Sequence, residues 1–315
     1  MMKCCNSIAL FPGLAALALL SAHLAAEEEK DVMEYVSPKG SYHIEWNDQA
    51  EPFIVSTRNS AERAPLPDAN GGHDPAECQV EFYYSPDESW LFYTEHWRHH
   101  GVREQELYHR ESGVKFAPLK GKKWFAQTVR SYAIKNGGFK KADFLEKRDE
   151  NHLETMFRCW SFDSSRLLFG IYGDVRERGP FYVYFNTRTK TLEQTPYLRE
   201  LNKNIPKNLP ERPADVVCAE PTEPLPPEAE LKARLDGLDE KLNKRYTERT
   251  SALGKEDADE LREKGEAWVK ARDEGVKMYL RFAPKGEEER RRLQFLAGVT
   301  TARLESSTSN SIGSL

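Results

Sequence analysis

Seven prolines crowd the stretch between residues 202 and 227, and they limit what the chain can form there. They stand at positions 206, 210, 213, 221, 224, 226 and 227. Proline has no backbone N–H and a fixed φ, so such a stretch suits neither a helix interior nor a central strand. We therefore predict an extended, semi-rigid linker over 202–227, with one folded region before it and another after it.

The region before the linker, residues 27–201, carries the signals of antiparallel strands. Three similar tetrapeptides begin at Ser37, Ser85 and Ser161, and each leads into an aromatic, apolar run. Ser-Pro-Asp suits a type I turn, because proline presets φ and Asp can accept a bond from the backbone that follows. The pattern predicts an antiparallel meander or sandwich of blade-like units. One inserted helix is expected at Trp124 to Ala133, where apolar residues recur at helical spacing.

The second of these turns, Ser85-Pro86-Asp87 followed by Trp90-Leu91-Phe92-Tyr93, resembles the blade turn of TolB-type β-propellers. The copies are spaced irregularly, 48 and then 76 residues apart. A closed propeller needs at least about four blades of roughly 40 residues. We therefore expect a small set of blade-like units rather than a complete propeller.

The region after the linker, residues 228–305, has helical periodicity. Leucines at 231, 235, 238 and 242 and Tyr246 share one helical face. We predict one helix from Glu228 to about Gly254, a second from about Asp257 to Phe282 and a third beginning near Glu287. The fold class expected is α+β in two domains, with the β region followed by a small antiparallel helical bundle. The Ser-rich tail, 306–315, is expected to be disordered.

This helical pattern resembles the helical domain of the LprI family of lysozyme inhibitors. The resemblance rests on Leu238 to Tyr246, Leu261-Arg262, Trp268 to Asp273 and Thr300 to Leu304. It implies a family motif formed by Tyr246, Trp268, Arg272, Asp273, Thr300 and Arg303. Where the family carries a pair of cysteines, this chain has Val276 and Phe295, which implies an apolar contact in place of a disulfide.

The motif residues also have a structural interpretation. Trp268 suits the core of a helical bundle, and Arg272, four residues later, lies beside it on the same face. An ion pair between Arg272 and a carboxylate of a neighbouring helix is the contact that we expect. On this interpretation the motif defines the fold of the helical region, and its residues are structural.

Residues 1–26 have the order of a secretory signal peptide. Lys3 precedes an apolar run from Ile8 to Leu20, and small residues lead to a predicted cleavage site near Ala26. The run is shorter than the roughly 20 apolar residues of a membrane span, and no later stretch could cross a bilayer. We therefore expect a periplasmic or secreted protein with no membrane span after cleavage.

Cys78, Cys159 and Cys218 follow the predicted signal peptide. An oxidising compartment favours one disulfide and one remaining thiol, and Cys78 with Cys159 is the first pairing to consider. A disulfide from Cys218 back to the β region is another pairing, and three buried, unpaired cysteines are the alternative to both.

We expect no catalytic, cofactor or metal site. His96, His99 and His100 lie beside Glu95 in a pattern that could suit a metal, but a polar loop between strands explains them better. Asp87 and Asp163 are turn residues rather than paired catalytic acids. The formal net charge of -5 mixes acids with bases, which argues against nucleic acid as a partner.

The function expected is therefore binding: an exported protein whose helical region contacts a protein partner. The family resemblance implies a lysozyme-type muramidase. Residues 230–305 hold 17 acidic and 18 basic residues, so attraction to a basic muramidase would depend on a local patch, at Glu256, Asp257, Asp259, Glu260 and Glu263. The alternative is a structural scaffold without inhibitory activity, in which the β region recognises an envelope protein and the helices self-associate.

Overall fold

The computed structural model describes residues 35–49, 51–69, 78–97, 101–121, 124–140, 154–172, 180–203 and 216–306. These residues form five helices and three antiparallel sheets, which confirms the α+β class. The chain divides into two compact units, Met1–Tyr35 and Val36–Leu315, and every element below belongs to the second. The predicted signal peptide, its cleavage site and the tail from 307 lie outside the described residues.

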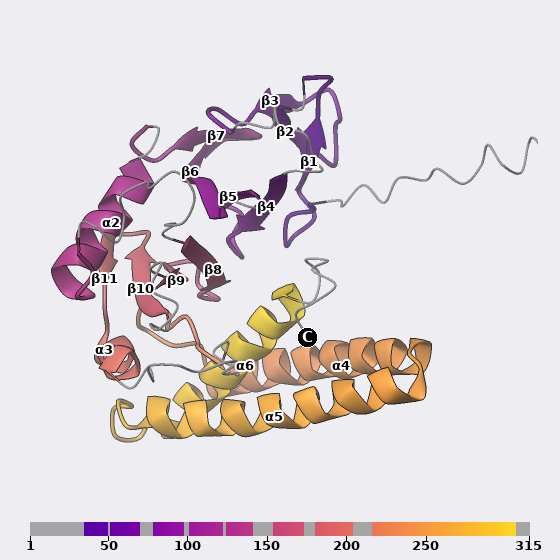
Figure 1. Cartoon of the computed structure of the whole chain (residues 1–315), viewed down its shortest axis with the longest axis vertical. Helices are drawn as coiled ribbons and strands as arrows, with labels where there is room; N and C mark the ends of the chain where they lie inside the picture. The colour runs from indigo at the N-terminus through magenta and orange to yellow at the C-terminus, as the bar shows by residue number, and fades with distance from the viewer. Residues whose placement is uncertain are drawn as a thin grey trace, which may run out of the picture. The chain divides into compact units, whose positions relative to one another are not determined.

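Each of the three sheets is a meander, in which strands that follow one another in the chain pair side by side (Figure 1). The first sheet contains β1 (Tyr42–Trp46), β2 (Pro52–Ser56) and β3 (Arg63–Pro65). The second contains β4 (Cys78–Tyr84), β5 (Trp90–Trp97), β6 (Gly101–Ser112) and β7 (Lys115–Pro118). The third contains β8 (Glu154–Trp160), β9 (Arg166–Tyr172), β10 (Phe181–Asn186) and β11 (Thr191–Glu193). The predicted meander is confirmed, with three blade-like sheets in the described part of the chain.

The three Ser turns have the same backbone geometry, one in each sheet. In each, the N–H of the fourth residue donates to the carbonyl of the serine: Gly40 to Ser37 at 2.8 Å, Glu88 to Ser85 at 2.8 Å, Ser164 to Ser161 at 2.9 Å. The fourth residue is left-handed in all three, with φ of 69° at Gly40, 63° at Glu88 and 57° at Ser164. Only the first turn uses glycine, the residue that adopts this conformation most readily.

The two non-glycine residues at that fourth position connect neighbouring sheets. The Glu88 carboxylate accepts hydrogen bonds from Ser37 Oγ at 2.6 Å and from the Lys39 N–H at 2.7 Å. Ser164 Oγ accepts the N–H of Asp87 at 2.9 Å. In both cases the side chain binds the N–H of the third residue of the preceding turn, so the repeated turn positions each sheet on the next.

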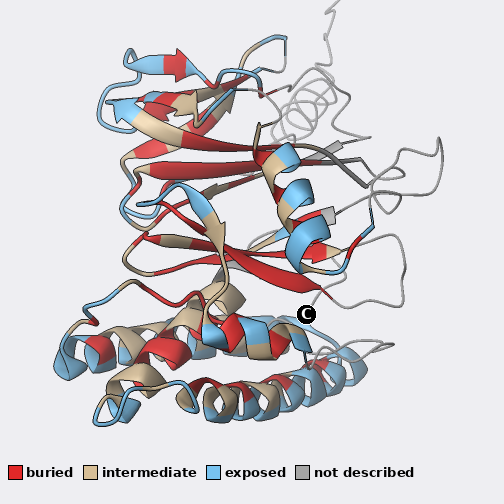
Figure 2. Ribbon diagram, turned by 90° about the vertical axis from the view of Figure 1, so that its left-hand side faces the viewer, coloured by how far each residue is buried: buried red, intermediate tan, exposed pale blue. Residues whose placement is uncertain are grey.

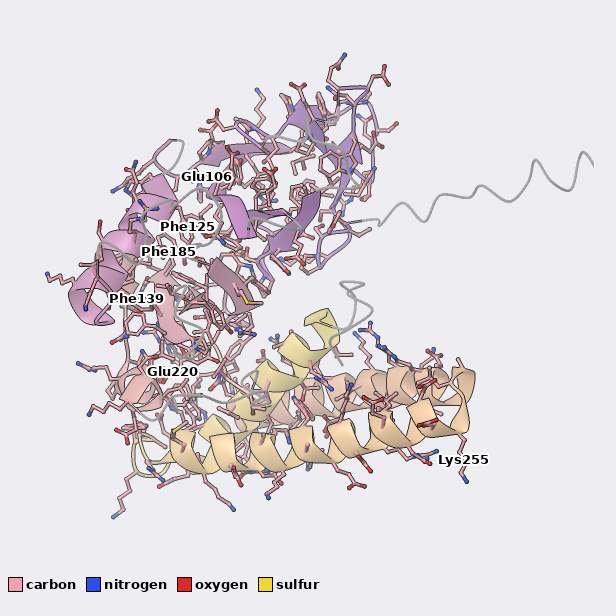
Figure 3. The ribbon with its side chains drawn as sticks, in the orientation of Figure 1. Glu106, Phe125, Phe139, Phe185, Glu220 and Lys255 are labelled. Atoms are coloured by element: carbon pink, nitrogen blue, oxygen red, sulfur yellow. The ribbon has the colours of Figure 1, made fainter. Side chains whose placement is uncertain are left out.

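The first core cluster lies between the second and third sheets and is closed by α2 (Trp124–Asn136). The helix contributes Phe125, Val129 and Ala133, which recur every four residues on one face. The Phe125 ring lies 5.4 Å from the Phe92 ring and 6.3 Å from the Phe185 ring, centroid to centroid (Figure 3). The inserted helix predicted from the sequence is therefore confirmed, and its function is to complete this core.

The third sheet is buried on both faces, which explains why β10 contains no exposed residue. Phe169, Val183 and Phe185 face the first cluster. Their neighbours Leu168, Tyr182 and Tyr184 face a second cluster. Side chains alternate between the faces of a strand, so a strand covered on both sides becomes continuously apolar.

The second core cluster joins the third sheet to the helices. Its members come from the sheet, from α3 (Pro196–Lys203), from residues 216–219 and from two long helices, α5 (Lys255–Leu280) and α6 (Glu288–Ser306). α4 (Glu228–Ala252) packs mainly against α6. The three helices predicted from the sequence are confirmed, and Figure 1 shows α4 and α5 side by side with α6 against them.

The described part of the proline-rich segment differs from the predicted spacer. Val216, Val217, Cys218 and Ala219 are buried in the second cluster instead of extending through solvent. The prolines exclude regular structure there, but the short apolar run between Pro213 and Pro221 still packs as irregular backbone. The regions on either side of this segment share one hydrophobic cluster, so packing does not mark a division between them. The domain boundaries at 201 and 228 therefore stay a prediction.

Candidate functional site

Trp268, at the centre of the LprI-like motif, is held between two arginines. Its side chain is buried within α5. The guanidinium carbon of Arg272 lies 5.4 Å from the ring centroid, and that of Arg303, from α6, lies 5.7 Å from it. These are cation–π distances, each worth about 0.5–2 kcal/mol depending on solvation. The motif therefore fastens α5 to α6, and the predicted core position of Trp268 is confirmed.

Carboxylates compensate the charge at this site. Arg272 Nε lies 3.3 Å from an oxygen of its neighbour Asp273, which is exposed. On α4, burial raises the pKa of Asp239, and the nearby Arg272 opposes that rise. The ion pair of Arg272 is thus with an acid of its own helix. The expected ion pair with a carboxylate of a neighbouring helix is not found among the described residues, and Asp239 of α4 feels Arg272 only as a nearby charge.

The other two motif residues also make helix contacts. Tyr246 packs on α5, where a Cβ added to Gly265 would come within 3.3 Å of the Tyr246 hydroxyl. Thr300 is fully buried on α6, and its hydroxyl has no hydrogen-bond partner among the described residues. Together the motif residues connect all three helices, but they do not form one chemical centre.

Val276 and Phe295, which the LprI resemblance compares with a pair of cysteines, lie at the second core cluster, where Phe295 is buried and Val276 is partly buried against it. Phe295 is fully buried, and its ring lies 5.2 Å from that of Tyr279 on α5. Gly275 allows this approach, because a Cβ there would lie 2.9 Å from Phe295 Cζ. Phe295 therefore makes an apolar contact with α5 through Tyr279 and Gly275, and a direct contact between Val276 and Phe295 stays a prediction.

A buried polar network, which the sequence analysis missed, lies where the proline-rich segment crosses the third sheet. Its centre is Glu220, which is 7% exposed and is labelled in Figure 3. The Glu220 carboxylate accepts hydrogen bonds from the hydroxyls of Thr195 and Tyr184. The single Tyr184 hydroxyl proton is shared between that carboxylate, 3.3 Å away, and the Cys218 carbonyl, 2.8 Å away, and the Tyr184 oxygen accepts the Glu220 N–H at 3.0 Å. Arg166 donates to the carbonyl of Pro221 at 3.0 Å.

This network has a strongly perturbed electrostatic environment. Burial raises the pKa of Glu220, against the hydroxyl of Thr195 and the charge of Arg166, which lower it. Burial also raises the pKa of the Cys218 thiol well above its ordinary value. A thiol with a raised pKa is a poor nucleophile. The hydrogen bonds of the network hold the segment against the third sheet.

The predicted disulfide between Cys78 and Cys159 is wrong, because Cys159 is buried and forms no disulfide. Cys218 is also buried and outside any disulfide, with its sulfur 2.8 Å from the Gln294 amide nitrogen of α6. Both thiols lie in the second core cluster, where they pack as small apolar side chains.

The histidines singled out in the sequence do not form a described centre. His96 lies on β5, and its side chain, like His99 and His100, lies outside the described residues. His109, on β6, packs edge-on against the Trp90 ring at 4.7 Å. Among the residues that the structure describes, no group of His, Cys, Asp or Glu side chains is arranged to hold a metal ion.

Asp87 and Asp163 are confirmed as turn residues. Asp87 accepts the hydroxyl of Ser85 at 2.6 Å, and Asp163 accepts that of Ser161 at 2.7 Å. Each carboxylate also accepts the backbone N–H two residues later. These turn hydrogen bonds explain why aspartate stands at both positions, and no catalytic role is needed to explain it.

Comparison with protein-family models and with curated proteins finds no match to this chain. No helix among the described residues is long and apolar enough to cross a membrane.

Proposed function

We propose that this chain is an exported binding protein that contacts a protein partner through its helical region. The observation that carries the proposal is the exposure of the α4–α5 hairpin. No residue between Glu240 and Gly254 is buried, although residues 240–252 form the last three turns or more of α4. An exposed, charged stretch of helix that no other part of the described chain covers is a surface suited to a partner (Figure 2).

The start of α5 is the part of this surface with a distinct charge. It presents Glu256, Asp257 and Glu263 to solvent, and none of the three forms an ion pair within the described residues. The other two acids of the patch are already paired, Asp259 with Arg262 and Glu260 with Lys264. Three uncompensated carboxylates on one exposed helix would attract a basic protein.

The partner class that the LprI resemblance implies, a lysozyme-type muramidase, is basic and fits such a patch. The motif residues themselves are engaged within the helical region, with Trp268 6% exposed. The exposed acids, rather than the motif, are therefore the proposed contact. Motif residues would act by holding the hairpin in position.

A cell-wall lysis assay tests the inhibitory form of this proposal. Residues 27–315 should slow the clearing of a suspension of cell walls by a muramidase, and E256K/D257K/E263K should lose most of that protection. K255E/K270E/K277E, which changes three exposed bases of the same helix, is the matched control and should still protect. Unimpaired lysis in the presence of the wild-type chain would exclude inhibition and favour the scaffold alternative.

A further inference from the structure

The long helix α4 is poorly covered by the rest of the chain. Of its 25 residues only Leu231 is buried. Leu235, Leu238 and Leu242 are half-buried, although they form the apolar face that the sequence pattern defines. The opposite face is mostly exposed, and a Cβ added to Gly237 on that face would meet nothing within 4 Å.

The charges of α4 are separated along its length. Residues 228–240 contain five acidic and two basic side chains, and residues 241–252 contain four basic and one acidic. The two halves therefore carry formal charges of −3 and +3, and the helix as a whole is neutral. A neutral helix whose two halves carry opposite charges is complementary to a second copy of itself that runs antiparallel to it.

We propose that α4 is a dimer interface, in which α4 of a second copy of this chain packs antiparallel to it across a two-fold axis near Glu240. This inference does not depend on the proposed muramidase partner. A two-fold axis makes every contact occur twice, so the acidic half of each helix would face the basic half of the other.

Antiparallel pairing centred on Glu240 gives defined neighbours. Asp236 would face Lys244 of the second copy, and Lys232 would face Glu248. All four side chains are exposed within one chain. A parallel arrangement would instead place like charges together, which costs free energy. Opposed helix dipoles also favour the antiparallel arrangement.

The choice of a second copy over a foreign partner follows from this charge pattern. A strongly basic or acidic partner would match one half of α4 and repel the other half. An antiparallel helix with the same distribution of charges avoids this conflict, because each of its halves then faces a half of opposite charge. In the dimer the second copy would cover the exposed half of α4, and the acidic start of α5 alone would remain as the proposed muramidase contact.

Sedimentation equilibrium of residues 27–315 tests the inference, with reversed-charge variants of each half. The wild-type chain should be a dimer. K241E/K244E/R249E and E230K/D236K/E240K should each weaken dimerisation roughly tenfold or more, because like charges then face one another. An equimolar mixture of the two variants should recover dimers, since an acidic helix then meets a basic one.

The matched control is K255E/K270E/K277E, which makes the same change of charge on α5 and should leave the dimer intact. Circular dichroism of each variant checks that its helices are retained. A monomeric wild-type chain would overturn the inference, and so would a dimer that neither α4 variant weakens. Failure of the mixture to recover dimers would overturn the antiparallel arrangement.

Discussion

At the scale of single residues, a buried acid, Glu220, and a partly buried one, Asp163, make the stability of the fold depend on pH in opposite directions. Glu220 is buried and has a raised pKa. Burial also opposes ionisation at the turn residue Asp163, but there the hydrogen bonds from Ser165, Ser161 and Thr222 prevail and lower its pKa. A raised carboxyl pKa favours the fold at low pH, and a lowered one favours it at neutral pH.

The first prediction concerns Glu220. Because its pKa is higher in the folded chain than in the unfolded chain, its contribution to stability is present below the ordinary carboxyl pKa and decreases as pH rises through the folded value. E220Q removes this titration. The melting temperature of E220Q relative to wild type should therefore increase between about pH 4 and pH 8. The exposed substitution E111Q should show no such trend, and a trend of opposite sign for E220Q would refute the account.

The second prediction concerns Glu88, whose carboxylate joins the first two Ser turns. E88A leaves the Ser37 hydroxyl and the Lys39 N–H without this acceptor. We expect the free energy of unfolding to fall by about 1–3 kcal/mol. Denaturant unfolding measures it, and E111A, at an exposed position of β6, should change it by less than about 0.5 kcal/mol. Equal effects of the two substitutions would mean that the turns do not hold the sheets together.

At the scale of elements, Gly275 of α5 allows α6 and the proline-rich segment to pack close to the helix. A Cβ at Gly275 would lie 2.9 Å from Phe295 Cζ and 3.2 Å from Val216 Cγ1. Both neighbours are buried and have little room to move. Gly275 is therefore the point where α5 contacts both α6 and the proline-rich segment.

A pair of glycine substitutions tests this contact. G275A should destabilise the fold by about 1–3 kcal/mol, because the added methyl overpacks the core. G237A, on the open face of α4, should instead stabilise it by roughly 0.5–1 kcal/mol through helix propensity alone. Chemical denaturation of the two variants gives both values. Stabilisation by G275A would show that the α5–α6 contact is looser than described.

Local patterns predicted much of this architecture, and distant contacts account for what they missed. The Ser turns, α2 and the three long helices follow from turn residues and from helical spacing, which depend on near neighbours. β6 was not predicted, because its sequence Arg103-Glu104-Gln105-Glu106 is polar while Gln105 and Glu106 are buried by tertiary packing. The burial of Val216 to Ala219 was missed for the same reason: the prolines predicted an extended spacer, whereas the burial depends on packing against residues that are distant in the sequence. The Glu220 network could not be predicted, because its residues come from four separate segments: β9, β10, the start of α3 and residues 218–221.

At the scale of the whole molecule, the helices and the third sheet share a core. Trp268, Tyr279 and Phe295 belong to the same cluster as Leu168, Tyr182 and Tyr184. The rings of Tyr197, from α3, and Tyr279 lie 5.1 Å apart. The helices of the LprI-like region therefore bury their apolar faces partly against the β region.

Excising the helices tests this dependence. A fragment of residues 228–306 should lose cooperative thermal unfolding, because it exposes the faces of α5 and α6 that the sheet and residues 216–219 cover. Residues 27–315 should unfold cooperatively under the same conditions. A fragment with native helicity and a sharp transition would show that the helical region is an independent domain, as its predicted boundaries imply.

We propose above all that the chain binds a basic muramidase through the exposed acids of α5. Titration calorimetry of residues 27–315 with a lysozyme-type muramidase tests it most directly. We predict saturable binding that weakens with added salt and falls roughly tenfold or more in E256K/D257K/E263K, while K255E/K270E/K277E binds at least as well as wild type. Absence of binding by the wild-type chain, or equal binding by the acid-reversed variant, would contradict the claim.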